Sequence, residues 1–138
     1  MLEASRRQPW VRAAFLVGVV YFVVGRAFAA PTNHVHAWRL AAWVVSGAAF
    51  AAHIAYEHFR LRNSPRSAAL HAALAVALGA FLLAIAGALH SLLTTSTIRP
   101  SWLLALVVWP VATAVPAFVA ALGTAAGLSR YRRNDDVG

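Results

Sequence analysis

Seven polar or bulky side chains recur at alternating spacings of four and three residues between positions 39 and 60. This spacing places residues on one face of an α-helix, and the set is Arg39, Trp43, Ser46, Phe50, His53, Glu57 and Arg60. If the helix lies in a membrane, an acidic side chain facing lipid costs about 2.5 kcal/mol or more. We therefore expect this face to point toward other helices.

Glu57 is the only acidic residue within any hydrophobic segment of the chain, and His53 and Arg60 lie one turn on either side of it. One interpretation is a glutamate and arginine pair that finishes a helix close to water. The other is an intramembrane polar site that handles protons or binds a ligand, because such groups often mark functional sites and histidine titrates near neutral pH. Both interpretations remain open from the sequence.

A second histidine is expected at the depth of His53. His53 lies seven residues before Arg60 and His71 five residues after Arg66, so at ~1.5 Å per residue the two rings reach nearly one level on neighbouring antiparallel helices. Two facing imidazoles are the ligands of a b-type haem. The pair therefore predicts, as one alternative, a haem, another metal or a quinone contact at His53 and His71; the residues alone leave the identity of any metal unknown.

His36 and His90 form a similar pair toward the opposite side. The 17 residues from His36 to His53 and the 19 from His71 to His90 rotate their helices in opposite senses at ~100° per residue. The two pairs therefore cannot share one interface, and a solvated histidine is the ordinary explanation of His36.

Two prolines flank a threonine in the last hydrophobic segment, at Pro110, Thr113 and Pro116. Each proline removes a helical hydrogen bond and frees a carbonyl, which predicts a kinked helix. Bent spans line sites in transporters, but proline is also frequent in membrane helices generally.

The composition indicates that membrane-spanning helices hold these residues in place. The chain has 138 residues, of which 61% are hydrophobic and 12% charged, with a mean hydropathy of +0.66. A soluble protein of this size could not bury so much apolar surface. Four segments approach the ~20 residues needed to cross a bilayer, at 10–30, 37–59, 67–93 and 102–128, followed by a polar tail at 129–138. We expect a single all-α domain, an antiparallel up-down bundle of four transmembrane helices.

Arginine alone supplies the 12 basic residues, and its distribution predicts the orientation. Nine arginines lie before or at the start of the first segment, between the second and third, or after the fourth, whereas only Arg26, Arg39 and Arg99 lie toward the other side. The positive-inside rule then places both termini in the cytoplasm. The absence of lysine together with the abundance of alanine is typical of a GC-rich genome, which favours a bacterial inner membrane.

The first segment has an alternative interpretation as a secretory signal. Arg6 and Arg7 precede an apolar run, and Ala27-Phe28-Ala29 resembles a cleavage site. Cleavage there would leave three spans. Arg26 is unfavourable so close to a cleavage site, and the run is long enough to cross the membrane, so a retained span is preferred.

Several functions are excluded or disfavoured. Without cysteine the chain has no disulfide, thiolate ligand or cysteine nucleophile, and it lacks the common hydrolase, metalloprotease, P-loop and dinucleotide motifs, so an enzyme is disfavoured. The basic residues flank hydrophobic segments, which argues against nucleic acid.

Small residues at 75, 79, 80, 84 and 88 let helix backbones approach closely. We therefore expect an accessory component of a membrane complex, bound to a membrane-protein partner or forming a homo-oligomer. The alternatives are a haem- or quinone-interacting redox subunit that uses His53 and His71, and a small proton-coupled transporter that uses Glu57 and His53.

Overall fold

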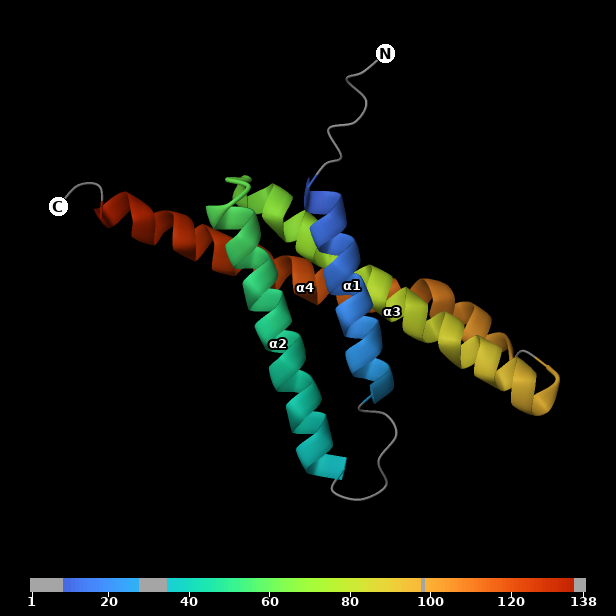
Figure 1. The fold of residues 1–138 in the computed structure, drawn as a ribbon. Coiled ribbons are helices and arrows are strands. Elements are labelled where there is room, and N and C mark those ends of the chain that lie inside the picture. Colours follow the sequence, from blue (N-terminus) through green and yellow to red (C-terminus); the bar gives the residue numbers. More distant parts are fainter. Residues whose placement is uncertain (1–8, 28–34, 98, 136–138) are drawn as a thin grey trace, which may run out of the picture.

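The computed structural model describes residues 9–27, 35–97 and 99–135, which form four α-helices and no other regular element in those ranges. They are α1 (Pro9–Ala27), α2 (Val35–Phe59), α3 (Pro65–Thr95) and α4 (Pro100–Asp135) (Figure 1). Each is long and apolar enough to cross a membrane. The predicted all-helical class with four long apolar helices is therefore confirmed. Residues 28–30 of the first expected segment, and with them most of the possible cleavage site, lie outside the described residues.

Local sequence explains where α3 begins and ends. The Ser64 hydroxyl accepts a hydrogen bond from the Ser67 backbone N–H at 3.2 Å, and Pro65 occupies the first turn, where its missing N–H costs nothing. At the other end Ser96 adopts a left-handed backbone conformation with φ of 56°, which stops the helix. The connection to α4 is consequently very short.

The last helix is longer than the sequence indicated. The polar tail was expected from residue 129, but α4 continues to Asp135. The apolar span stops at Leu128, where the hydrophobic residues stop. The helix itself continues, because no glycine or proline between Leu128 and Asp135 interrupts it. Only residues 136–138 of the predicted tail lie outside the described residues.

Helix α3 is the centre of the structure and packs mainly against α4 and α1. A methyl group built on Gly79 would lie 2.6 Å from the Tyr21 Cβ, and one on Gly18 would lie 3.0 Å from the Ala75 carbonyl oxygen. Ala80 and Ala84 are buried as well. Small residues therefore set the close approach of α1 and α3, as the spacing on α3 indicated.

Helix α2 joins the others mainly at the end near its connection to α3. There Ile54 belongs to a buried cluster with Ala69 and Ala72 of α3 and Ala121 and Ala125 of α4. Toward its beginning α2 diverges from the inclined α3–α4 pair (Figure 1). This divergence leaves room between α2 and the other helices.

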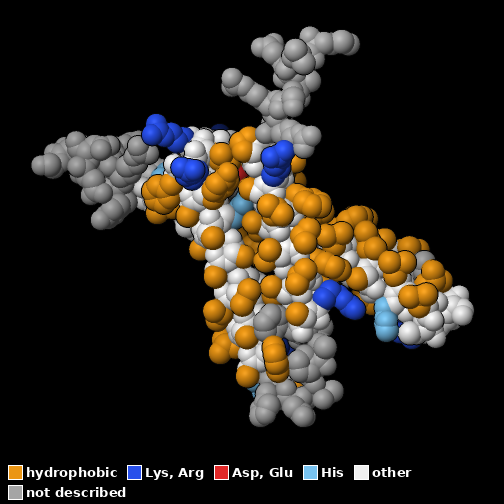
Figure 2. Space-filling model, viewed as in Figure 1, with side chains coloured by type: hydrophobic (Ala, Val, Ile, Leu, Met, Phe, Trp, Pro, Cys, Tyr) orange, Lys and Arg blue, Asp and Glu red, His pale blue; other side chains and the backbone are white. Residues whose placement is uncertain are grey.

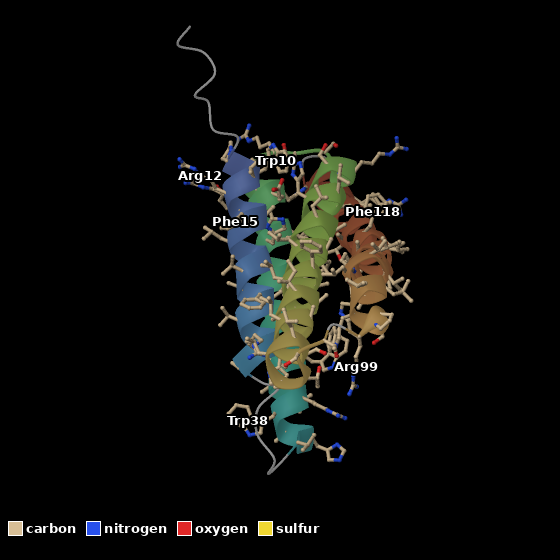
Figure 3. The ribbon with its side chains drawn as sticks, turned by 90° about the vertical axis from the view of Figure 1, so that its right-hand side faces the viewer. Trp10, Arg12, Phe15, Trp38, Arg99 and Phe118 are labelled. Atoms are coloured by element: carbon tan, nitrogen blue, oxygen red, sulfur yellow. The ribbon has the colours of Figure 1, made fainter. Side chains whose placement is uncertain are left out.

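The exterior is apolar. Figure 2 shows hydrophobic side chains over the visible helix faces, with arginine side chains near the end where α2 meets α3. Figure 3 places Trp10 and Arg12 at one end of the helices and Trp38 and Arg99 toward the other. Tryptophan near both ends of apolar helices is typical of the two membrane interfaces.

Candidate functional site

The carboxylate of Glu57 is the centre of a buried polar cluster. The residue has no exposed surface. Its Oε2 atom lies 3.0 Å from Nδ1 of His71 on α3 and also accepts a hydrogen bond from the Asn63 side-chain amide in the α2–α3 connection. When the carboxylate is ionised, His71 Nδ1–H is the donor. Two donors from different segments thus compensate the buried charge.

The turn after α2 brings Asn63 back to Glu57. The backbone N–H of Arg60 donates to the Tyr56 carbonyl at 2.9 Å, and that of Asn63 donates to the Glu57 carbonyl at 3.2 Å. Between them Arg62 adopts a left-handed conformation with φ of 51°. This conformation reverses the chain direction, so the Asn63 amide reaches the carboxylate six positions earlier in the chain.

Trp10 covers the cluster from α1. Its ring stacks on His71 with a centroid separation of 4.1 Å and an interplanar angle of 3°. His71 is therefore held both by a carboxylate at Nδ1 and by an indole against its ring. Three helices and the α2–α3 connection meet at this one pair of ionisable groups.

Two further buried histidines, His53 and His58, lie on α2 with Glu57. His53 is only 3% exposed, and neither of its ring nitrogens has a hydrogen-bond partner among the described residues. Glu57 Oε1 and His58 Nε2 are also without a partner there. A buried polar atom that lacks a hydrogen bond costs about 1 to 3 kcal/mol. A hydrogen-bonding ligand that reached these atoms would therefore stabilise the structure.

Arg60 does not join the cluster, contrary to the predicted glutamate and arginine pairing. Its side chain is exposed, and the described residues contain no ion pair between it and Glu57. Helix α2 is assigned to Phe59, and the Arg60 N–H still donates to the Tyr56 carbonyl, so the helical spacing holds but the guanidinium points out to the exterior. His71 and Asn63 take its place, and Glu57 is not close to water.

The proposed outer histidine pair is not assembled. His36 and His90 are both exposed, and they lie near the start of α2 and the end of α3, which are well separated in Figure 1. The expected equal heights assumed parallel helix axes, whereas α2 and α3 diverge. The exposure of both residues agrees with the ordinary explanation of a solvated histidine.

The two prolines of α4 lie inside a continuous helix. The Thr113 hydroxyl donates to the Trp109 carbonyl at 2.9 Å and lies 3.1 Å from the Pro110 carbonyl. This back-bonding is the usual arrangement of threonine in a membrane helix. A kink between Pro110 and Pro116 stays a prediction.

A metal or haem at His53 and His71 also stays a prediction. The described residues contain no group of three or more histidine, cysteine or acidic side chains placed to hold a metal ion, but a bis-histidine haem needs only two. With Nδ1 of His71 bound to Glu57, its Nε2 atom is the nitrogen left for a ligand. A carboxylate at the other ring nitrogen is common behind metal-bound histidines.

Sequence reasoning missed two members of the cluster, Asn63 and Trp10. Asn63 stands in the short connection after α2, directly before the Ser-Pro start of α3, and an asparagine in such a connection is a usable signal for a side chain that bonds to the nearby chain. Trp10 stands at the start of the first hydrophobic segment, where tryptophan ordinarily anchors a helix at the membrane interface. Its stacking on His71 depends on how α1 packs, which no local pattern shows.

Searches against known protein families, curated proteins and solved structures find no match for this chain.

Proposed function

We propose that the protein is a multi-pass component of a bacterial inner membrane, with four antiparallel spans in one domain and both termini in the cytoplasm. Its role is non-enzymatic: it associates with another membrane protein or with further copies of itself. The distribution of arginine supports the orientation, and the four long apolar helices support insertion.

The uncovered face of α4 carries this proposal. No residue in the most apolar window of this helix is buried, and large side chains follow one another along its surface at helical spacing, at Leu104, Val108, Val111, Val115 and Val119. These residues are at least half exposed. Lipid alone can cover such a face, but β-branched side chains of restricted rotamers lose little entropy when a second helix packs on them.

The buried polar cluster fits this role as a structural connection. Glu57 and His71 join α2 to α3, while Trp10 adds α1. With little extramembrane mass, the chain depends on such internal contacts to keep one arrangement of its helices. A fixed arrangement is what a partner helix would recognise.

Cysteine crosslinking tests the proposal, because the chain contains no cysteine of its own. Val111→Cys on the α4 face should give a slower-migrating product in oxidised membranes, whereas Val20→Cys on the exposed face of α1 is the matched control. Product at 111 and not at 20 supports association through α4. A single monomeric band from both variants, together with a monomeric mass in mild detergent, would refute it.

A second candidate function is proton-coupled transport, and the unpartnered nitrogens of buried His53 favour it. Together with Glu57 and His71 they supply three ionisable groups in the interior of the helices. Proton entry into vesicles containing the protein, followed with an internal pH dye, should disappear in Glu57→Gln and persist in the tail variant Asp136→Asn. Equal proton entry in the Glu57→Gln variant and the parent would exclude this function. A dithionite-reduced spectrum of the same sample checks for haem at His53 and His71.

A further inference from the structure

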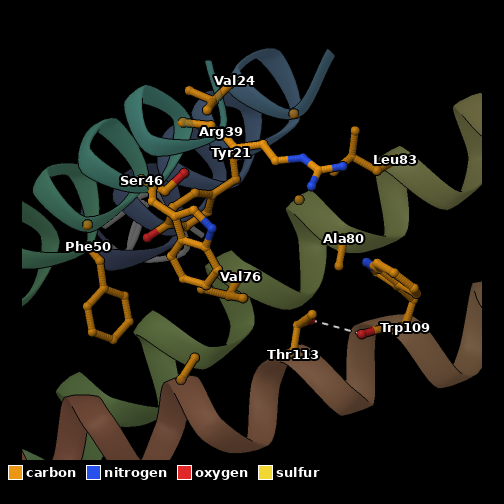
Figure 4. Close-up of a pocket in the computed structure, with 16 residues that line it drawn as sticks. Tyr21, Val24, Arg39, Ser46, Phe50, Val76, Ala80, Leu83, Trp109 and Thr113 are labelled. Carbon is orange, nitrogen blue, oxygen red and sulfur yellow. Dashed lines mark hydrogen bonds between the residues drawn. The ribbon is translucent and has the colours of Figure 1, made fainter. Parts of the chain in front are cut away.

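A cavity of about 570 Å³ lies between α2 and the other three helices (Figure 4). Its walls are mainly apolar, with Trp43 and Phe50 from α2, Leu83 from α3 and Trp109 from α4. The volume falls within the ~300 to 1,000 Å³ of typical small-ligand sites. The cavity exists because α2 diverges from α4 beyond the Ile54 contact.

One positively charged side chain, that of Arg39, lies at the end of this cavity nearest the start of α2. No ion pair with Arg39 occurs among the described residues. The chain has four acidic residues, and the one whose side chain is described, Glu57, is already bound by His71 and Asn63. Within the described part of the chain, the charge of Arg39 is therefore available to an external anion.

A second polar group in the cavity wall also needs a partner. The Tyr21 hydroxyl is buried and has no hydrogen-bond partner within the described part of the chain, and Tyr21 lines the same cavity. Figure 4 shows Tyr21, Arg39 and Ser46 on one side of the cavity and Thr113 and Trp109 on the other. The hydroxyl itself is enclosed by the protein, so Arg39 is the charged group that the cavity offers to a ligand directly.

The dimensions match an extended chain beneath a charged head. Arg39 is the fifth residue of α2, at the level of an interface, and Phe50 lies 11 residues further along, which is ~16 Å of helix. An acyl chain fits this apolar length, and a phosphate at Arg39 is a good partner for a guanidinium. We propose that the cavity binds one anionic phospholipid, with its phosphate at Arg39 and one acyl chain between α2 and α4.

This inference rests on the proposed membrane insertion. Quenching of tryptophan fluorescence by brominated lipids distinguishes a failure of insertion from a failure of lipid binding in the cavity. The protein is reconstituted in phosphatidylcholine vesicles with a fraction of brominated phosphatidylglycerol or brominated phosphatidylcholine of the same chains. We expect the phosphatidylglycerol to bind with about tenfold preference, because both headgroups offer a phosphate to Arg39 but phosphatidylcholine also brings its choline cation close to the guanidinium. If neither lipid quenches, the chain is not inserted, and both proposals fail. If both quench equally, insertion holds and the lipid site is refuted.

Two pairs of variants assign the preference to the cavity. Arg39→Gln should abolish it, while Arg99→Gln, which removes another outer arginine outside the cavity, should keep it. Gly47→Leu fills the cavity from a position where an added Cβ meets nothing within 4 Å, and should weaken binding; Gly123→Leu also enters open space but lies outside the cavity. An unchanged preference in Arg39→Gln, or competition by a neutral quinone that does not depend on Arg39, would overturn the assignment.

Discussion

Removing the Glu57 carboxylate should destabilise the protein through the partners left behind. In Glu57→Ala the buried His71 Nδ1–H and the partly buried Asn63 amide lose the oxygen that they now share. Each buried donor without an acceptor costs about 1 to 3 kcal/mol, and breaking a buried charged pair typically costs about 3 to 5 kcal/mol. Because Asn63 retains some contact with water, we expect a loss of roughly 2 to 5 kcal/mol in the free energy of unfolding.

A double-mutant cycle isolates the contact itself. Glu57→Ala, His71→Ala and the double variant are unfolded reversibly in mixed micelles, and the coupling energy is taken from the four stabilities. We expect about 1.5 to 3 kcal/mol, because the hydrogen bond involves a charged group and is shielded from water.

The matched control replaces His71→Ala by Arg60→Ala. Arg60 is exposed and makes no ion pair with Glu57 within the described residues, so its coupling should stay below about 0.5 kcal/mol. A coupling of Glu57 to Arg60 that equals or exceeds its coupling to His71 would show that the reasoning from the buried contact is wrong.

Three further changes have expected outcomes that thermal unfolding in detergent can measure. Gly79→Ala should lose about 1 to 3 kcal/mol by overpacking, because its Cβ would lie 2.6 Å from a Tyr21 atom, whereas Gly47→Ala meets nothing and should be nearly neutral; equal effects would contradict the close α1–α3 contact. Trp10→Phe should lower the midpoint by weakening the stack on His71, by about 0.5 to 1.5 kcal/mol, and an unchanged midpoint would mean that the stack adds nothing. Arg62→Gly should raise stability by up to about 1 kcal/mol, since glycine tolerates the positive φ of 51°; a loss would show that the arginine side chain contributes more than its strain costs.

The fold followed from the sequence more closely than the site did. Apolar segments bounded by proline, serine and arginine indicated four helices, and their bounds are correct to a few residues except at the end of α4. The small residues Ala75 and Gly79 indicated a close helix contact on α3, and Gly79 meets α1 there. These features are local, because hydrophobicity, helix caps and side-chain size act within a few residues of the chain.

The site was only partly predictable. Glu57 and His71 were both singled out, from polarity and from depth along neighbouring helices. Their actual contact at 3.0 Å depends on which faces of α2 and α3 meet. Arg60, the alternative partner one turn from Glu57, is exposed and makes no ion pair with it within the described residues. Depth alone does not fix rotation or divergence, which is also why His36 and His90 remain apart.

By itself the sequence determined the class of element, the number of helices and the sparse set of polar residues that the apolar segments contain. Only the tertiary structure decided that Asn63 and Trp10 belong with Glu57 and His71, and that α2 diverges to leave a cavity beside Arg39. The reason is physical. Hydrophobic burial requires long apolar helices but is non-directional, whereas hydrogen bonds, ring stacking and cavities depend on the relative positions of segments that lie far apart in the chain.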